Sequence, residues 1–409
     1  MFLSLVVIGL AFSTSFLLNQ LLLSSAENGN VSTLRLLLNL ESVFGKTLVD
    51  VDYREENCYI ARNGAKFCQG GETPLIVAVK HNQKDVVELL LHHNASRYLG
   101  DLERYQFPLE YAISSSTPTI IELLLTNETF ENVHYGRKVL AAASRKGDLA
   151  LVKKLQNLGA IFDETDYPNI SPLVQAAANG NTEIVKQLLD QGIGLKNGPA
   201  AIKLAAQQGH TASVKALLDY LDKTGTDRKV LLEARVDSGD FTRGFTPLIS
   251  ASQSGRDDTV RLLLQYGADV ENIDQQNYTA LLQAAKESRS STIKILVEEG
   301  KADIHKIDGE HLRTAFGWAG ARGDIESIKF LIEKGSDVGH KDRYGRTALT
   351  WTTRIGYHLA TKAIGDYGNP IKTDILDALR YAESECWALK ENCDKTVEVL
   401  KEMLKKNKT

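Results

Sequence analysis

The chain has 409 residues, of which 43% are hydrophobic and 24% charged, a balance that is typical of folded proteins and excludes global disorder. Its 48 Lys and Arg residues nearly offset its 52 Asp and Glu residues, and the net charge of −4 is spread along the chain without a basic block. We therefore expect no nucleic-acid partner, because such a partner selects a dense cationic surface.

The first segment of the chain is apolar, and no charged side chain occurs before Glu27. An apolar stretch over residues 2–10, followed by small residues at Ser13 and Ser15, predicts a signal peptide over residues 1–15, although no Lys or Arg precedes it. Two alternatives remain. Residues 2–23 are just long enough for an uncleaved membrane anchor, or they form a buried capping helix of a cytoplasmic protein.

The four cysteines fall into two local pairs, as disulfides of an oxidising compartment do. Asn63-Gly64 marks a hairpin turn whose register places Cys58 opposite Cys68, so we predict that these two are bridged, with Cα atoms about 4.4–6.8 Å apart. Cys386 and Cys393 lie on one helix face or at a helix–turn–helix corner, and their pairing stays open. Zinc is the alternative partner for all four.

Asn-x-Ser/Thr sequons, which a eukaryotic secretory route would glycosylate, occur at several positions. The candidate positions are Asn30, Asn94, Asn127, Asn169, Asn277 and Asn407. Ordinary polar turn composition is the alternative explanation for them.

A repeated unit dominates the chain after residue 18. The best copy runs from Thr246 to Asp269, and the most common spacing between copies is 33 residues. Aligned copies share one small residue four positions before a turn, at Ser25, Ala78, Ala112, Ala143, Ala176, Ala205, Ala251, Ala284, Ala319 and Thr352. Two insertions, over residues 41–71 and 221–244, interrupt the period and contain loop sequence that could carry binding.

Each recurring residue of the unit has a local physical cause. Thr or Ser before Pro supplies a cap for the first helix, and Pro tolerates the first helical position because its missing N–H costs nothing there. Val/Ile-x-x-Leu-Leu then predicts a second helix with one apolar face. Glycines supply the left-handed residue that ends the first helix at positions 147, 180, 209, 255, 323 and 356.

The unit resembles the ankyrin repeat, whose Thr-Pro-Leu signature occurs here at Thr73 and Thr246, with Ser171 in the equivalent place of a third copy. The resemblance covers nearly all of the chain after residue 18 in about eleven copies. It implies an all-α solenoid of stacked helix-turn-helix units with short β-hairpin loops, an array over residues 16–368 and a degenerate capping repeat over residues 369–409. The family's His after Thr-Pro-Leu is replaced by Ile76, Val174 and Ile249.

The sequence contains no pattern typical of a catalytic site. The nine His residues are scattered, and neither a phosphate-binding loop nor a nucleophile elbow occurs. Asp269, Asp303 and Asp337 recur near the repeat period, which favours a role in turns over acid–base chemistry. We therefore expect no catalytic residue, cofactor or metal. A novel enzyme site in the 221–244 insertion is the alternative.

Tyrosines in or beside the inter-repeat loops are the candidate protein-binding residues, because a Tyr side chain buries much area with few rotors. They are Tyr53, Tyr59, Tyr105, Tyr135, Tyr167, Tyr278 and Tyr344. Packing of one loop on the next is the alternative role for them.

The sequence as a whole predicts a non-enzymatic interaction protein of the secretory route. We expect it to be monomeric by itself and to bind a protein partner of unknown identity through the concave face and loops that the resemblance implies. A membrane-tethered protein that retains residues 2–23, or a secreted effector or toxin-like protein, is the alternative.

Overall fold

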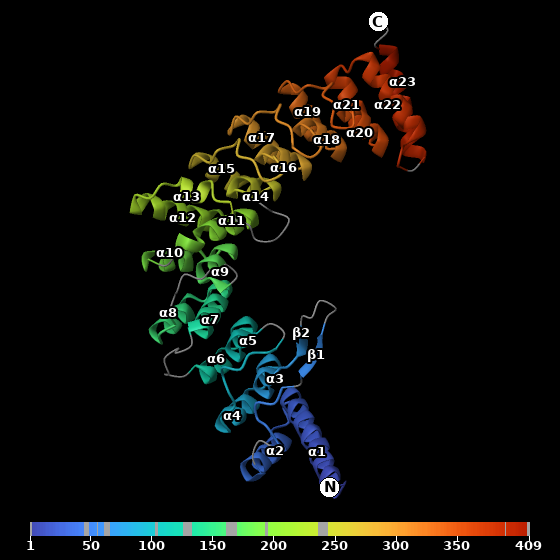
Figure 1. Cartoon of the computed structure of the whole chain (residues 1–409). Coiled ribbons are helices and arrows are strands. Elements are labelled where there is room, and N and C mark those ends of the chain that lie inside the picture. The colour runs from blue at the N-terminus through green and yellow to red at the C-terminus, as the bar shows by residue number, and fades with distance from the viewer. Residues whose placement is uncertain are drawn as a thin grey trace. The chain divides into compact units, whose positions relative to one another are not determined.

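The computed structural model describes most of the chain, and Figure 1 shows its course from end to end. The described residues are 2–44, 49–54, 56–60, 66–102, 105–125, 133–160, 170–192, 195–235, 244–388 and 390–406. Within these ranges, side chains are described except at residues 2–13, 41–44, 56–60, 66–70, 133–134 and 195. The chain divides into two compact units, the N-terminal unit of residues 1–175 and the C-terminal unit of residues 176–409.

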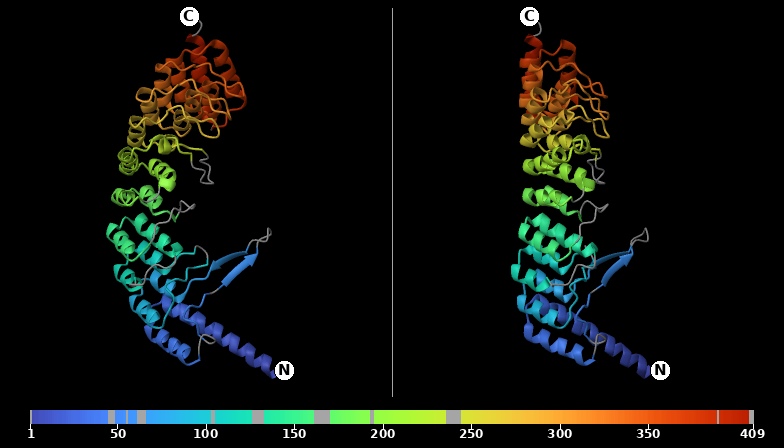
Figure 2. Two further views of the ribbon diagram at one scale, coloured as in Figure 1. Left: turned by 60° about the vertical axis from the view of Figure 1, so that its left-hand side comes forward. Right: turned by 90° about the vertical axis from the view of Figure 1, so that its left-hand side faces the viewer.

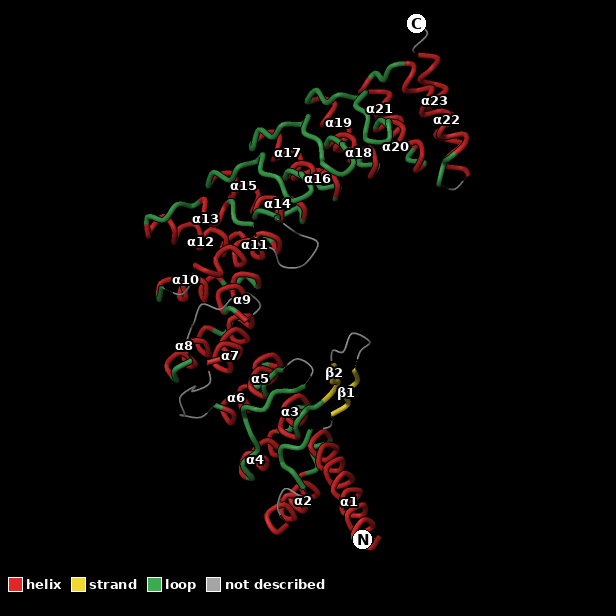
Figure 3. Tube along the Cα trace, in the orientation of Figure 1, coloured by secondary structure: helices red, strands yellow, loops and turns green. Residues whose placement is uncertain are grey.

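The N-terminal unit consists of paired helices and one hairpin (Figure 3). Its elements are α1 (Phe2–Glu27), α2 (Val31–Phe44), β1 (Glu56–Ile60), β2 (Lys66–Gly70), α3 (Pro74–Lys80), α4 (Lys84–His92), α5 (Pro108–Ser115), α6 (Pro118–Leu124), α7 (Val133–Lys146) and α8 (Leu149–Asn157). The first helix of each pair packs on the first helix of the next, in the order α1, α3, α5 and α7, while α2, α4 and α6 form a second layer. Helix α9 (Pro172–Ala178) crosses the division between the units.

The C-terminal unit continues the same alternation in two layers (Figure 2). Its elements are α10 (Thr182–Asp190), the 3-10 turn η2 (Leu195–Asn197), α11 (Gly198–Gln208), α12 (Thr211–Thr224), α13 (Lys229–Leu232), α14 (Pro247–Gln253), α15 (Asp257–Gln265), α16 (Ala280–Lys286), α17 (Ser290–Glu298), α18 (Ala315–Arg322), α19 (Ile325–Glu333), α20 (Ala348–Ile355), α21 (His358–Gly368), α22 (Lys372–Ser384) and α23 (Lys390–Lys406). The first-helix layer is α11, α14, α16, α18, α20 and α22; the second-helix layer is α10, α12, α15, α17, α19, α21 and α23.

The described helices form eleven successive pairs along the chain, with α13 outside the pairing, which agrees with the expected number of copies. The short helix α13 belongs to the 221–244 insertion, of which residues 236–243 lie outside the described ones. Ahead of it, Arg228 stacks at 5.0 Å on the ring of Tyr266, the residue directly after α15, and pairs with Asp222 of α12, so the described start of the insertion is fastened to the second-helix layer.

The predicted helix signals are confirmed. Thr73 and Thr246 adopt extended backbone, and their hydroxyl oxygens accept the N–H groups of Ile76 at 3.2 Å and Ile249 at 3.3 Å. The predicted glycines all have positive φ, as at Gly209 with φ of 84°. The copy that has Ala315 in place of Pro still begins its helix there, since Thr314 caps it in the same way.

The aligned small residues are buried in every copy, and this explains why they are small. Their side chains lie where the first helices of neighbouring copies approach each other. The backbone carbonyl of each accepts an N–H from the residue five positions later, as Ala251 does from Arg256 at 2.9 Å, and this bond closes the turn between the paired helices.

The first insertion contains the predicted hairpin. Strands β1 and β2 are antiparallel, and Cys58 lies opposite Cys68 as the register predicted. The turn at Asn63-Gly64 and the two cysteine side chains lie outside what the structure describes, so the bridge between them stays a prediction. Helix α1 runs through the predicted cleavage positions without a break. In the part of the chain whose side chains are described, no helix is both long and apolar enough to cross a membrane.

Candidate protein-binding face of the C-terminal unit

The loops between copies in the C-terminal unit begin with the recurring aspartates, and these have the predicted structural role. The Oδ1 atoms of Asp269, Asp303 and Asp337 each accept the backbone N–H of the residue two positions later, at 2.9 Å in all three loops. Such Asx turns fix the start of a loop, which is the structural role expected of these aspartates.

A second set of aspartates, Asp274, Asp308 and Asp342, lies five residues further along each loop and is buried. In each, Oδ1 accepts backbone N–H groups of the same loop. Their Oδ2 atoms accept a hydrogen bond from a side chain of the following first helix: Gln283 Nε2 at 2.8 Å, Trp318 Nε1 at 2.9 Å and Trp351 Nε1 at 2.8 Å, respectively. We call each such pair a loop–helix lock, because one carboxylate joins the loop to the helix.

Electrostatics favours the ionised form of the last of these aspartates. Burial alone would raise the pKa of Asp342, but hydrogen bonds from Trp351 and from the amides of Arg346 and Tyr344, together with the Arg313 charge, outweigh burial and hold the pKa below its usual range. Arg313 lies 3.3 Å from the carboxylate through its Nε, and both groups are buried. The carboxylate is therefore fully used within the protein.

Tryptophan and arginine side chains alternate beside the locks. The Arg313 guanidinium lies 4.6 Å from the ring of Trp318 and 4.2 Å from that of Trp351. Further along, Arg354 lies 5.7 Å from Trp351 and 3.8 Å from Trp387. We call these five residues the Trp–Arg row. It includes all three tryptophans of the chain.

The row changes from buried to exposed along its length. Trp318 is 6% exposed, Trp351 is half-buried and Trp387 is 62% exposed. An exposed Trp usually has freedom to move, but Trp387 is held in place. Its backbone N–H donates to the Arg354 backbone carbonyl at 2.8 Å, and its neighbour Cys386 is bridged to Cys393.

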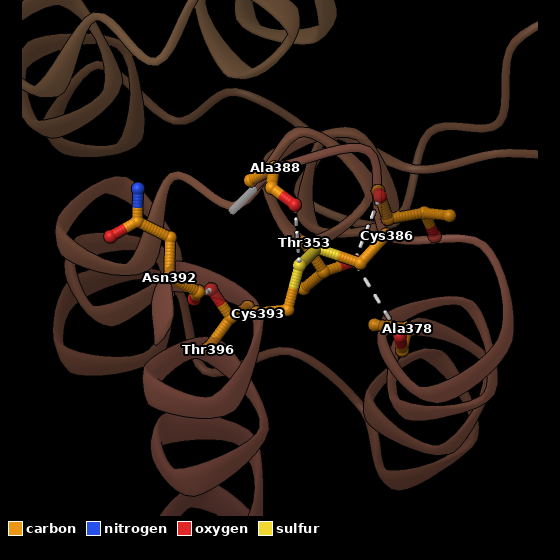
Figure 4. The surroundings of a disulfide bond; sticks show 8 residues. Thr353, Ala378, Cys386, Ala388, Asn392, Cys393 and Thr396 are labelled. Atoms are coloured by element: carbon orange, nitrogen blue, oxygen red, sulfur yellow. Dashed lines mark hydrogen bonds between the residues drawn. A yellow bond between two sulfur atoms is a disulfide. The ribbon is translucent and has the colours of Figure 1, made fainter. Parts of the chain in front are cut away.

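The disulfide between Cys386 and Cys393 joins the end of α22 to the start of α23, with Cα atoms 6.0 Å apart (Figure 4). This is the helix–turn–helix corner that the sequence allowed, and the bridge leaves no free thiolate for zinc at this pair. Cys393 Sγ also lies 3.6 Å from the Ala388 carbonyl oxygen, in the turn that presents Trp387. In the described part of the chain, no group of three His, Cys, Asp or Glu side chains is arranged to hold a metal ion.

A groove of about 360 Å³ lies beside the row, between the loop before α20 and one face of α22. Lys341, Gly345 and Thr347 line its loop side, and Asp374, Asp377, Arg380, Tyr381, Ser384 and Glu385 line its α22 side. Glu385 lies 3.4 Å from Arg354, which links the groove wall to the guanidinium that stacks on Trp387.

The predicted tyrosines divide into two groups. Tyr344 and Tyr105 are exposed at 57% and 66%, and Tyr53 is half-buried, so these remain available to a partner. Tyr135 and Tyr278 are 2% and 0% exposed, which is incompatible with the predicted role in partner contact. Their rings pack against Phe107 and Trp318, so the packing alternative holds for both. The Tyr59 side chain and Tyr167 lie outside the described residues.

The described sequons are accessible. Asn30, Asn94 and Asn277 are exposed, and the last two adopt left-handed backbone in turns, with φ of 61° and 59°. Asn127, Asn169 and Asn407 lie outside the described residues.

The sequence analysis missed the locks and the Trp–Arg row. A readable signal was present, because Asp308 and Asp342 precede Trp318 and Trp351 by 10 and 9 residues, and Asp274 precedes Gln283 by 9. The three tryptophans lie in or just after first helices, away from the inter-repeat loops in or beside which the candidate tyrosines lie. The row could not be read from spacing alone, since each arginine meets one ring of its own copy and one of the next: Arg313 meets Trp318 and Trp351, and Arg354 meets Trp351 and Trp387.

Comparison with known proteins gives matches over most of the chain. The family model described as ankyrin repeats (3 copies) matches residues 15–134, 139–228 and 228–308. A Caenorhabditis elegans homologue of transient receptor potential cation channel subfamily A member 1 is 32% identical over 131 residues, which are 31% of this chain and 10% of that protein. The human channel of that name is 27% identical over 308 residues, covering 71% of this chain and 26% of that protein.

A fungal protein and a solved structure also match the chain. The ankyrin repeat protein nuc-2 of Neurospora crassa is 29% identical over 169 residues, which are 35% of this chain and 16% of that protein. The chain thus spans only 10% to 26% of the length of these curated relatives. Among solved structures, the human ASB11 ankyrin repeat domain aligns with 57% of this chain and 98% of its own, at 21% identity and a TM-score of 0.48.

Proposed function

Because this chain belongs to the ankyrin-repeat family, we propose that it is a non-enzymatic interaction protein whose C-terminal unit binds a protein partner along the Trp–Arg row. Repeats of this family imply a scaffold for protein–protein interaction. The family does not specify which face binds the partner, so that choice is argued from the residues of this chain.

The observation that carries the proposal is the placement of every tryptophan of the chain in one row, interleaved with arginine. Trp, Tyr and Arg are the residue types that contribute most to binding energy at protein interfaces. The two most accessible rings here are Trp387 and Tyr344, at 62% and 57% exposed.

Rigidity of the face adds to this support. The loop–helix locks hold the loops, and the disulfide corner holds Trp387, so little conformational freedom is lost when a partner binds. The buried members of the row serve as supports, while the exposed rings supply the contact area.

The test is co-purification of the full chain from its native source with identification of partners by mass spectrometry. The double variant Trp387→Ala with Tyr344→Ala should lose the partner recovered by the unaltered chain. The matched control is Tyr367→Ala, because Tyr367 is also exposed, at 49%, but lies on α21 in the second-helix layer. Equal recovery with the double variant and the unaltered chain would refute this face as the binding site.

We also propose that the protein enters the secretory route. Support comes from the apolar first segment, the disulfide between Cys386 and Cys393 and the exposed sequons, of which Asn30 is one. Amino-terminal sequencing of the mature protein tests the proposal: a start at residue 14 or 16 is expected. A mature chain that begins at residue 1 or 2 would contradict cleavage and leave the tethered alternative standing.

A further inference from the structure

We propose that the partner is recognised through an acidic peptide segment, which lies in the groove beside α22 and places one of its carboxylates on the guanidinium of Arg346. This inference rests on the proposed function, since it names the chemistry of the partner at the same face.

Arg346 is the side chain that points to this chemistry. It is half-buried, and its guanidinium lies 5.2 Å from the ring of Tyr344, 5.1 Å from Trp351 and 5.8 Å from Tyr381. Its Nε is shielded from solvent and has no hydrogen-bond acceptor among the described residues. No described carboxylate pairs with it.

Arg346 differs from the two arginines of the Trp–Arg row in having no described carboxylate partner. Arg313 pairs with Asp342 at 3.3 Å and Arg354 with Glu385 at 3.4 Å, so each of those guanidinium groups stacks on tryptophan and also has its own carboxylate. Arg346 has the stacking without the carboxylate. A planar guanidinium held between rings presents its remaining N–H groups in a fixed direction, which suits bidentate binding of a carboxylate.

The charge around Arg346 favours an anion. The loop of residues 339–347 carries Lys341, Arg343 and Arg346, and its only carboxylate, Asp342, is buried and already bound. Lys341 lies 4.0 Å from Asp374 of α22, so Arg343 and Arg346 supply the positive charge that has no described carboxylate partner. Arg343 donates to the Gly309 carbonyl at 2.9 Å, which spreads this positive charge over two adjacent loops. A partner with acidic residues therefore complements the loop edge.

The shape of the groove favours an extended peptide over a single small anion. It follows one face of α22 from Asp374 to Glu385, two positions separated by about three turns of helix. Arg346 and Trp387 adjoin the groove without lining it: the Arg346 guanidinium lies 5.8 Å from the ring of Tyr381 in the groove wall, and Glu385 pairs with Arg354, which stacks on Trp387. Backbone groups of a peptide would meet the hydroxyl and charged side chains of the walls, while an apolar residue would pack on Trp387.

A phosphorylated peptide fits less well than a carboxylate. The groove walls carry Asp374, Asp377 and Glu385, which lie 4.0 Å from Lys341, 3.4 Å from Arg380 and 3.4 Å from Arg354, respectively. These partly offset carboxylates oppose a phosphate dianion more strongly than they oppose a single carboxylate charge. One carboxylate on Arg346 satisfies one guanidinium and adds only one negative charge.

The experiment is selection from a display library of random linear peptides on the full chain, followed by the same selection on the variant Arg346→Gln. Peptides enriched on the unaltered chain and absent from the variant should share an acidic residue. Binding of one such peptide is then measured by fluorescence anisotropy, together with its Glu→Gln or Asp→Asn analogue and its phosphoserine analogue.

We expect the amide analogue, and likewise Arg346→Gln, to weaken binding about tenfold or more, because each removes a charge-assisted bidentate pair. Arg346→Lys keeps the charge but not the planar group and should recover only part of the affinity. The matched control is Arg261→Gln, since Arg261 is an exposed guanidinium on α15 in the second-helix layer and should leave binding unchanged. Circular dichroism confirms that each variant is folded.

Three outcomes would overturn the inference. Enriched peptides without acidic residues, or peptides that bind Arg346→Gln as tightly as the unaltered chain, would reject the role of Arg346. Tighter binding of the phosphoserine analogue would assign the site to phosphate instead. If such peptides nevertheless lose affinity for Trp387→Ala, the proposed function stands and only the acidic chemistry falls. If no selected peptide loses affinity for Arg346→Gln or for Trp387→Ala, the result counts against both the acidic-peptide inference and the proposed function.

Discussion

The two units are built from the same helix pair, but they fasten their inter-repeat loops differently. In the C-terminal unit, Asp274, Asp308 and Asp342 form three successive locks with Gln283, Trp318 and Trp351. In the described part of the N-terminal unit, one comparable pair occurs, with the Tyr111 hydroxyl donating to Asp101 Oδ2 at 3.1 Å. This difference indicates that the shared fold positions the helices, whereas the number of contacts that hold a loop to its helix depends on a few side chains outside the repeat signature.

The cavities of the two units differ in the residues that line them. The N-terminal unit has a cavity of about 460 Å³ near the turns of α5–α6 and α7–α8, lined by side chains such as Ile121 and Leu151 and by the ion pair of Glu122 with Lys154. No aromatic residue lines it. The smaller groove of the C-terminal unit has Tyr381 in its wall, and its Glu385 pairs with the arginine that stacks on Trp387, which is why we place partner binding there.

The largest effect should come from breaking the last lock. Asp342→Ala leaves the buried Arg313 charge and the Trp351 N–H without their acceptor, so we expect the C-terminal unit to lose about 3–5 kcal/mol of stability. Native-state amide hydrogen exchange on the full chain reports each unit separately.

The corresponding change in the N-terminal unit, at Asp101, should cost less stability than the change at Asp342. Asp101→Ala removes an acceptor for two neutral donors, the Tyr111 hydroxyl and the Gln106 N–H, so the expected loss is about 1–3 kcal/mol. Equal losses at Asp342 and Asp101 would mean that the two units hold their loops equally well.

Removing the disulfide should have the next largest effect. The double variant Cys386→Ser with Cys393→Ser opens a short loop and should cost about 2–3 kcal/mol in the last helix pair, with no change in the N-terminal unit. Hydrogen exchange at α22 and α23 measures this loss, and quenching of Trp387 fluorescence by acrylamide reports its release from the corner. Unchanged exchange at these helices would show that the corner is held by packing alone.

Helix caps should have a smaller effect, and the same one in both units. Thr73→Ala and Thr246→Ala each remove one hydroxyl acceptor at the first turn of a first helix, so we expect a loss of about 1 kcal/mol in either unit. Thermal unfolding of the two variants, followed with hydrogen exchange at α3 and α14, checks the equality. A clear difference between the two losses would mean that the capping Thr contributes unequally to the stability of the two units.

The smallest effect concerns pH and has opposite signs in the two units. Burial raises the pKa of Glu110 in the N-terminal unit, more than its hydrogen bond from the Phe107 N–H and the nearby Lys138 lower it. Its contribution to stability is therefore present below the pKa of the unfolded chain and lost as pH rises through the folded pKa. The lowered pKa of Asp342 gives the reverse, a contribution present above the unfolded pKa and lost as pH falls through the folded pKa.

Two neutral variants test these signs. Glu110→Gln should raise the Tm of the full chain at about pH 7 and leave it unchanged at about pH 3, where the carboxyl is already protonated. Asp342→Asn should lower the Tm at neutral pH and matter less as pH falls. A Tm difference of the same sign for both variants at neutral pH would contradict the assignment.

Much of the fold was readable from the sequence because its causes are local. Thr73 and Thr246 cap helices, and glycines such as Gly209 end them, through interactions within a few residues. The hairpin register of Cys58 with Cys68 was readable for the same reason, since a short turn fixes it.

The binding face was less predictable, because its residues meet across copies. Tyr278 and Tyr344 are both loop tyrosines, yet Tyr278, directly before the capping Thr279, is buried against Trp318, and Tyr344, three residues before the capping Thr347, is exposed. Which of them packs depends on the side chains of the next copy, and spacing does not reveal that. The pairing of Cys386 with Cys393 likewise depends on how the last two helices turn.

The most direct test of the central claim is an amide hydrogen-exchange footprint of the full chain with and without its co-purified partner. The account predicts that protection on binding concentrates at residues 339–347 and 381–388, which carry Tyr344, Arg346 and Trp387. Protection confined to the N-terminal unit, or to α15, α17 and α19 of the second-helix layer, would contradict it.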